Sequence, residues 1–265
     1  MRRSLDVVIV GAGERNLLVS DKVPGPELEL ALHSAALWQT LAQELPSSIE
    51  YERKGGLVVA QAEDSLAGLS ATAAGQRRAG VEAYDLTAGR LREIEPHLAP
   101  GPAGGCLYPQ DAQVQPALAA AELLRSSVRA GACLWPGEEV VAILADRAGA
   151  VSGVRTARCE LRAPVVVNAA GTWGGEVAAL AGTPLPVMPR RGFVLVTEPL
   201  PRLIRHKVYA AEYVAYARAP RAVAANPGKV GEGVRYGAAL ARAGVRVRTR
   251  RAVTEVRGDG RVGRR

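Results

Sequence analysis

Apolar residues recur at helical spacing in several separate segments of the chain. In PELELALHSAALWQTLAQEL, residues 26–45, they fall on one face, which predicts a helix packed against a core. The members of that face are Leu28, Leu32, Ala35, Trp38, Leu41 and Leu45. Residues 63–78 and 117–131 predict two more helices, and Pro116 is well placed to open the second. Thr87 is the expected N-cap of a short helix that stops at Pro96.

Strand patterns fill most of the chain between these helices. YERKGGLVVAQ, residues 51–61, predicts a strand, a turn at Gly55-Gly56 and a second strand, and further strands are expected at 84–86 and up to Tyr108. After Gly131 we expect two or three strands: CLWP, EEVVAILAD and AVSGVRT. Val7–Val10 and PVVVN are apolar on both faces, which is typical of buried parallel strands. The order of elements predicts an α/β fold, with an α+β arrangement for the chain as a whole.

Composition narrows the class of protein. Of 265 residues, 48% are hydrophobic and 23% are charged, as in ordinary globular proteins. Asp6 interrupts the first apolar run, and no stretch approaches the roughly 18 apolar residues of a membrane span, so we expect no integral membrane segment and a cytoplasmic location. Cys106, Cys133 and Cys159 are widely spaced, which favours reduced thiols, and no metal site is expected.

Positive charge is concentrated at the end of the sequence. The net charge is +8, and residues 217–265 alone carry 13 Lys or Arg against 3 Asp or Glu. Tyr236 is the only aromatic residue there, so nucleic-acid binding is not expected, whereas docking on an acidic protein partner is an option. With few large apolar side chains, residues 217–265 are predicted to be a poorly packed basic tail. Residues 236–262 repeat the pattern of 118–154, either as an internal repeat or through shared composition.

The opening stretch VVIVGAGERNLLVSDKVPGP starts like a dinucleotide-binding turn. Gly11 and Gly13 have the spacing of the first half of G-x-G-x-x-G, but Asn16 stands at the third glycine position. Ser20-Asp21, Pro24 and Pro26 then interrupt the region where the phosphate-facing helix should run. The stretch is therefore either a cofactor turn, the remnant of one, or an ordinary strand-to-loop turn.

Four stretches together resemble the FAD-dependent amino acid oxidoreductases of the D-amino acid oxidase, glycine oxidase and sarcosine oxidase superfamily. They are DVVIVGAG at 6–13, GGCLYPQDAQVQP at 104–116, VNAAGTW at 167–173 preceded by Val166, and PVMPRRGFVLVTE at 186–198. The resemblance covers most of residues 1–214. It implies a partial Rossmann-like FAD-binding domain, residues 1–46 and 110–185, with an inserted antiparallel-sheet substrate domain, residues 47–109 and 186–216.

The resemblance also implies where a flavin and a substrate would lie. The cofactor residues expected from it are Gly11, Ala12, Gly13, Val140, Ala169, Ala170, Gly171 and Trp173. Tyr209, Tyr213 and Arg191 are candidates for the substrate pocket, although the tyrosines fit a core equally well and the arginine a solvated surface. No catalytic side chain is assigned, because FAD would carry the redox chemistry of oxidising a small amino acid or secondary amine at its C–N bond.

Residues 169–175 carry an independent physical argument for the same site. Ala169, Ala170 and Gly171 leave almost no side chain at the carboxyl end of a predicted parallel strand, where α/β sheets bind ligands. Gly174 and Gly175 then begin a helix whose N–H groups could face a phosphate. The alternative is a tight strand-to-helix crossover packed against the sheet.

The chain departs from the family pattern after Gly13. Relatives continue into a helix and a second strand that ends in an acidic residue, and this chain has neither. It passes instead to ERNLLVSDKVPGPELELAL, which resembles a later flavin-side loop of the family, so two similar stretches are joined with the intervening part missing. FAD binding is expected to be weakened, so that truncation could leave the oxidase inactive. The alternative function is a non-catalytic interaction subunit, or a remnant of such an oxidase, with a basic docking tail.

Overall fold

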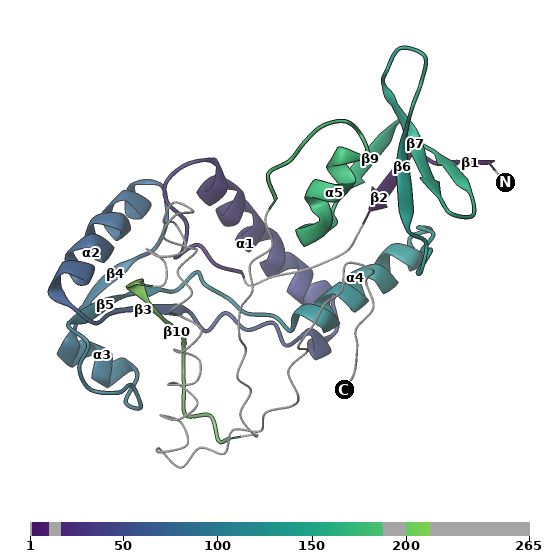
Figure 1. Cartoon of the computed structure of the whole chain (residues 1–265). Helices are drawn as coiled ribbons and strands as arrows, with labels where there is room; N and C mark the ends of the chain where they lie inside the picture. Colours follow the sequence, from purple (N-terminus) through teal and green to yellow (C-terminus); the bar gives the residue numbers. More distant parts are fainter. Residues whose placement is uncertain (1, 11–16, 188–199, 213–265) are drawn as a thin grey trace, which may run out of the picture.

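A computed structural model describes residues 2–10, 17–187 and 200–212 and arranges their strands in three sheets (Figure 1). The largest core surrounds a four-stranded sheet in the order β10-β3-β5-β4, formed by Lys207–Ala210, Gly56–Ala60, Gly104–Tyr108 and Tyr84–Thr87. β5 pairs antiparallel with β3 and β4, whereas β10 pairs parallel with β3. The predicted α/β class, with a mainly antiparallel sheet, is confirmed.

Helices cover both faces of this sheet. α2, Glu63–Arg78, packs Leu69 and Ala73 against Val58 of β3. α3, Ala88–Ile94, packs Leu91 against the opposite face, which carries Leu57. Because β3 is buried along its whole length, it is the central strand of this core.

Two further helices pack beside this body. α1, Pro26–Glu44, and α4, Pro116–Arg129, both have proline in the first turn, where its missing N–H costs nothing. Trp38 of α1 and Ala119 of α4 meet in a core that also contains Ile49 of the short 3-10 helix η1, Ser47–Ile49. All four predicted helices up to residue 131 are present, and Thr87 Oγ1 accepts a hydrogen bond from Arg90 N as expected of an N-cap.

The other two sheets form a separate layer at the far side of α1 and α4 (Figure 1). β1, Arg2–Ser4, β8, Glu160–Arg162, β7, Val151–Thr156, and β6, Val140–Ala145, form one sheet in that order. β2, Val7–Val10, and β9, Val165–Asn168, pair in parallel as a two-stranded sheet, followed by the 3-10 helix η2, Gly171–Trp173, and α5, Gly174–Ala179. The predicted parallel pairing is thus confirmed.

Burial of that parallel pair on both faces was a wrong expectation. One face carries Val8 and Val166, which pack with Val154 and Leu161 of the neighbouring sheet. The opposite face is exposed, and its apolar members are Val7, Ile9, Val165 and Val167. Parallel sheets normally carry helices on both faces, so one covering layer is missing among the described residues.

Residues 51–61 also differ from the prediction. Only Gly56–Ala60 forms a strand, because β5 and β10 already occupy both of its edges. Glu52 forms an isolated bridge with Gln113 instead, and Gly55, at φ +78°, turns the chain into β3. The expectation for residues 217–265 lies outside the described residues, and no helix among those described is long and apolar enough to cross a membrane.

Two glycine substitutions test this packing as a matched pair. A Cβ built on Gly56 would lie 2.1 Å from Asp111 Oδ2, whereas a Cβ on Gly68 within α2 meets nothing within 4 Å. We expect Gly56→Ala to lower the free energy of unfolding by about 1–3 kcal/mol through overpacking. Gly68→Ala should raise it by about 0.5–1 kcal/mol through helix propensity. Urea unfolding midpoints measure both, and an unchanged midpoint for Gly56→Ala would contradict the close contact with Asp111.

Candidate functional site

The candidate ligand surface lies where β2 and β9 end side by side. Ala169 N donates a hydrogen bond of 2.8 Å to Val10 O, which continues the parallel pairing past the last strand residue. Asn168 Nδ2 donates to Gly174 O at 2.8 Å, and its Oδ1 accepts from Ala170 N at 3.2 Å. The side chain of Asn168 therefore fixes the turn, and the backbone from Ala169 onward faces outward.

This turn is open at one end and tightly packed at the other. Gly171 has φ +57°, and a Cβ there would meet nothing within 4 Å, while the neighbouring Trp173 is 62% exposed. A Cβ on Gly175, in contrast, would lie 3.0 Å from Leu185 O. A tight strand-to-helix crossover therefore describes Gly175. Residues 169–173 instead leave room for a flat group to approach the backbone.

The connection from β2 to the next paired residue is short. β2 ends at Val10, and Leu17 already bridges Ala112 at the start of the segment that leads to α1. Six residues separate them. A crossover between parallel strands needs a dozen residues or more, so no helix and second strand can fit here. The short connection supports the interpretation that Gly11 and Gly13 are joined directly to a stretch that resembles a later flavin-side loop of the family.

Several predicted site residues cannot be placed. Gly11, Ala12, Gly13, Arg191 and Tyr213 lie outside the described residues. Val140 begins β6 and packs with the core around Val154 and Leu161, rather than at the turn after β9. The structure therefore brings together four of the predicted cofactor residues: Ala169, Ala170, Gly171 and Trp173.

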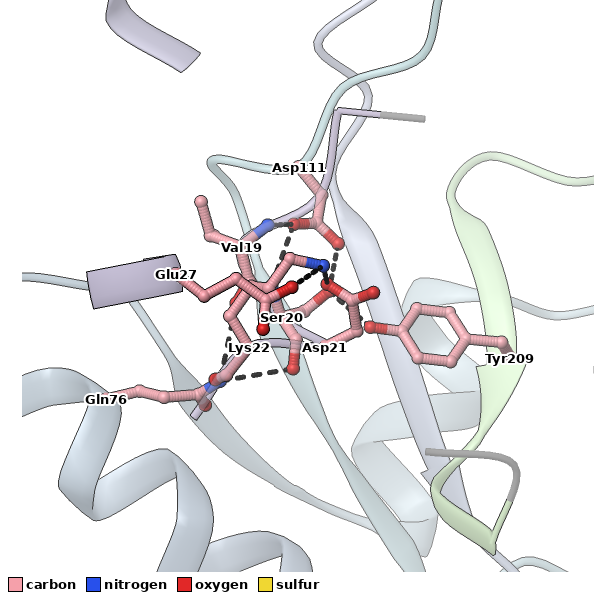
Figure 2. Close-up of polar contacts among 8 residues, drawn as sticks. All are labelled: Val19, Ser20, Asp21, Lys22, Glu27, Gln76, Asp111 and Tyr209. Carbon is pink, nitrogen blue, oxygen red and sulfur yellow. Dashed lines mark hydrogen bonds and ion pairs between the residues drawn. The ribbon is translucent and has the colours of Figure 1, made fainter. Parts of the chain in front are cut away.

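A buried carboxylate, Asp111, lies beside the loop around Ser20 (Figure 2). Asp111 is fully buried, and its Oδ1 accepts hydrogen bonds from Val19 N at 2.9 Å and Ser20 N at 3.2 Å, while Ser20 Oγ donates to Oδ2. Burial raises the pKa of Asp111, and the hydrogen bonds from Val19 and Ser20 offset this only in part. Asp111 thus fixes the loop around Ser20 to the segment that follows β5.

The same cluster reaches the predicted substrate residue Tyr209. Its hydroxyl is hydrogen-bonded to Ser20 Oγ, and its ring packs against the core beneath α2 (Figure 2). Lys207, two residues earlier on β10, has its Nζ buried without a hydrogen-bond partner in the described parts of the chain. Burial lowers the pKa of Lys207, and the nearby Asp111 and Asp21 partly offset this. Tyr209 therefore links β10 to the loop around Ser20.

Gln76 of α2 fixes the other side of that loop. Its Nε2 donates to Ser20 O at 3.1 Å and to Lys22 O at 2.5 Å, and its Oε1 accepts from Tyr108 OH at 2.8 Å. A fully buried amide with these partners satisfies the loop's carbonyl groups, which would otherwise be costly to bury. The loop around Ser20 is consequently held from both α2 and Asp111.

Glu95 anchors the segment that leads into β10. This buried carboxylate accepts from Arg205 N at 3.0 Å, from His206 N at 3.1 Å and from His206 Nδ1 at 3.0 Å. Burial acts to raise the pKa of Glu95, but the hydrogen bonds from Arg205 and His206 outweigh it and hold that pKa below its usual value. The position of Tyr209 therefore depends on a carboxylate more than a hundred residues earlier in the chain.

Sequence reasoning missed these anchoring residues. Asp111 lay in a stretch noted only as a polar loop, Ser20 was interpreted as punctuation, and Glu95 as part of a short helix. The sequence marks each of these residues only as a polar side chain near a strand end or a proline. Many surface loops have the same feature, so it does not distinguish a buried anchor. The long-range partners of these residues, which define their role, lie 56 to 189 residues away in the sequence.

Comparisons with known proteins agree with the predicted resemblance. A family model described as FAD dependent oxidoreductase matches residues 8–221. Glycine oxidase of Geobacillus kaustophilus is 35% identical over 191 residues, which cover 70% of this chain and 50% of that protein. Hydrogen cyanide synthase subunit HcnC of Pseudomonas aeruginosa is 30% identical over 188 residues, or 69% of this chain and 45% of its own.

A solved structure gives the same result in three dimensions. The crystal structure of glycine oxidase from Geobacillus kaustophilus superposes with a TM-score of 0.68 at 29% identity, covering 78% of this chain and 66% of that one. The chain spans about half the length of the curated relatives that it matches.

The anchor at Glu95 gives a pH prediction. A carboxyl whose folded pKa is lowered stabilises the fold above its unfolded value of 4.5, and this contribution is lost as pH falls through the folded pKa. We expect Glu95→Gln to lower the free energy of unfolding by about 1–3 kcal/mol at pH 7. The difference from the unsubstituted protein should shrink as pH falls below 4.5.

The matched control is Glu93→Gln. Glu93 pairs with Arg90 on the exposed side of the same helix, where ion pairs contribute about 0–1 kcal/mol. Urea unfolding across this pH range measures both variants. A Glu95→Gln effect that stays constant down to the acid transition would contradict the anchor.

Proposed function

The chain belongs to the family of FAD-dependent oxidoreductases, and from that premise we propose that it binds FAD where β2 and β9 end and oxidises a small amino acid or secondary amine at its C–N bond. The supporting observation is the small-residue turn after the parallel pair. Ala169, Ala170 and Gly171 lie where α/β sheets bind ligands, and the space beside Gly171 is open.

The residues present fit this cofactor in part. Backbone groups of residues 169–171 are accessible to a flat ring system, and exposed Trp173 offers an aromatic surface beside them. When bound, FAD supplies the redox chemistry, and the protein supplies position and electrostatics. In this proposal residues 1–46 and 110–185 hold the cofactor, and residues 47–109 and 186–216 hold the amine.

In this proposal, strand β10 lines the amine pocket. Tyr209 lies on this edge strand with its hydroxyl bonded to Ser20, and Glu95 fixes the strand's beginning. The ring of Tyr209 is held in one orientation by these contacts. Tyr213 and Arg191 complete the proposed amine pocket, and both lie outside the described residues.

The short connection after β2 sets the expected affinity. Without a helix after the glycine turn, FAD loses a dipole contribution of about 0.3–1 kcal/mol and several charge-assisted hydrogen bonds of roughly 1.5–3 kcal/mol each. A total loss of about 5 kcal/mol weakens binding by more than about a thousandfold. We therefore expect FAD to bind weakly and to be lost during purification.

The same short connection favours a second candidate function, a non-catalytic interaction subunit. The matched hydrogen cyanide synthase protein is itself named as a subunit. In this alternative the basic segment 217–265 docks on an acidic partner, and the association weakens in high salt. A cytoplasmic location belongs to either proposal and accords with the three free cysteines.

A titration with FAD tests the proposed cofactor site. Added FAD should produce a saturable change in flavin absorbance and fluorescence, with weak affinity. Ala169→Asp places a negative charge where we expect the anionic cofactor and should weaken binding at least about tenfold, through roughly 1.4 kcal/mol or more of lost affinity.

The matched control, Ala179→Asp, puts the same charge at the exposed end of α5. It should leave FAD affinity unchanged. Absence of any FAD signal in the folded protein at high FAD concentration would contradict the proposed site and leave the interaction subunit as the account of this chain.

A further inference from the structure

Helix α4 turns an apolar stripe toward solvent. Leu118 is 41% exposed and Val128 is 49% exposed, and Ala121 and Leu124 lie between them at helical spacing. The buried side of the same helix carries Ala119, Leu123 and the carboxylate Glu122. The exposed apolar stripe therefore lacks a partner among the described residues.

This stripe forms one wall of a groove of about 480 Å³. The groove is lined by Ala121, Leu124, Arg125, Val128, Arg129 and Leu134. Arg125 Nη1 lies 2.6 Å from Glu122 Oε1, while Arg129 forms no ion pair within the described ranges. An apolar floor with a positive rim fits apolar side chains flanked by carboxylates.

The outer face of α1 has that chemistry. Leu30 is 69% exposed and Leu37 is 53% exposed, and their seven-residue separation puts them on one side of the helix. Glu29 and Glu44 are exposed on the same side, and neither forms an ion pair with another described residue. Because both surfaces are open to solvent in a single molecule, they do not cover each other within it.

We propose that the α4 groove binds the outer face of α1 from a second copy of this chain. An α4-to-α4 contact would bring Arg125 and Arg129 of both copies together, whereas α1 supplies the opposite charge. A standard interface buries about 800 Å² per partner, more than a single short groove offers. Reciprocal exchange supplies the contact twice, and one copy can offer both surfaces because Trp38 of α1 and Ala119 of α4 belong to the same core.

Sedimentation of two complementary variants tests this contact. Leu37→Asp spoils the α1 face and Val128→Asp spoils the α4 groove, and each alone should weaken self-association at least about tenfold. Mixed one to one, the two variants retain one undamaged α1-to-α4 contact, so we expect a heterodimer tighter than either variant's homodimer. Val151→Asp on exposed β7 is the control that should leave association unchanged.

Arg129→Glu gives a second test, because it alters only the rim charge and removes no buried contact. We expect it to weaken association severalfold, while urea unfolding shows that the variant remains folded. A monomer at all concentrations, or dimers that survive both Asp substitutions, would overturn the proposal. A mixture of the two Asp variants no tighter than each alone would also overturn it, and unchanged association of one Asp variant would overturn it by identifying a self-contact of the other helix.

Discussion

The buried carboxylate of Asp111 is the constraint on which the arrangement of the described chain depends. It lies beyond the end of β5, over Gly56 of β3, and holds Val19 and Ser20 by their backbone N–H groups. Through Ser20 it also reaches the hydroxyl of Tyr209 on β10. Burying an ionisable group is costly unless its oxygens are hydrogen-bonded, and here they are. The loop around Ser20 and the edge strand β10 are therefore positioned by one side chain.

That anchor also explains why the short connection after β2 does not disturb the four-stranded sheet. Leu17 begins the segment that Asp111 and Gln76 hold, so α1 and the four-stranded sheet are fixed independently of β2. The parallel pair of β2 and β9 is affected instead, because one of its faces is left exposed. Val7, Ile9, Val165 and Val167 face solvent because no covering helix follows β2. Among the described residues, the uncovered face thus lies on the parallel pair, whereas helices cover both faces of the four-stranded sheet.

Local patterns predicted most elements because their causes are local. Thr87 as an N-cap, Pro116 at a helix start and the valine runs of β2 and β9 act through neighbouring backbone groups. The strand expected at residues 51–54 failed, because both edges of β3 were taken by segments 50 and 150 residues away. The roles of Asp111, Glu95 and Gln76 were invisible for the same reason: each is defined by distant partners. The small-residue turn at Ala169–Gly171 was predictable, since its openness follows from residue type.

Hydrogen exchange at two backbone amides tests the central role of Asp111 most directly. If its carboxylate holds the loop as part of the core, the amides of Val19 and Ser20 exchange only with global unfolding. Their protection would then equal that of Val58 and Cys106, the paired residues of β3 and β5. Exchange of Val19 and Ser20 many times faster than those strand amides would show that the loop opens on its own and would contradict the account.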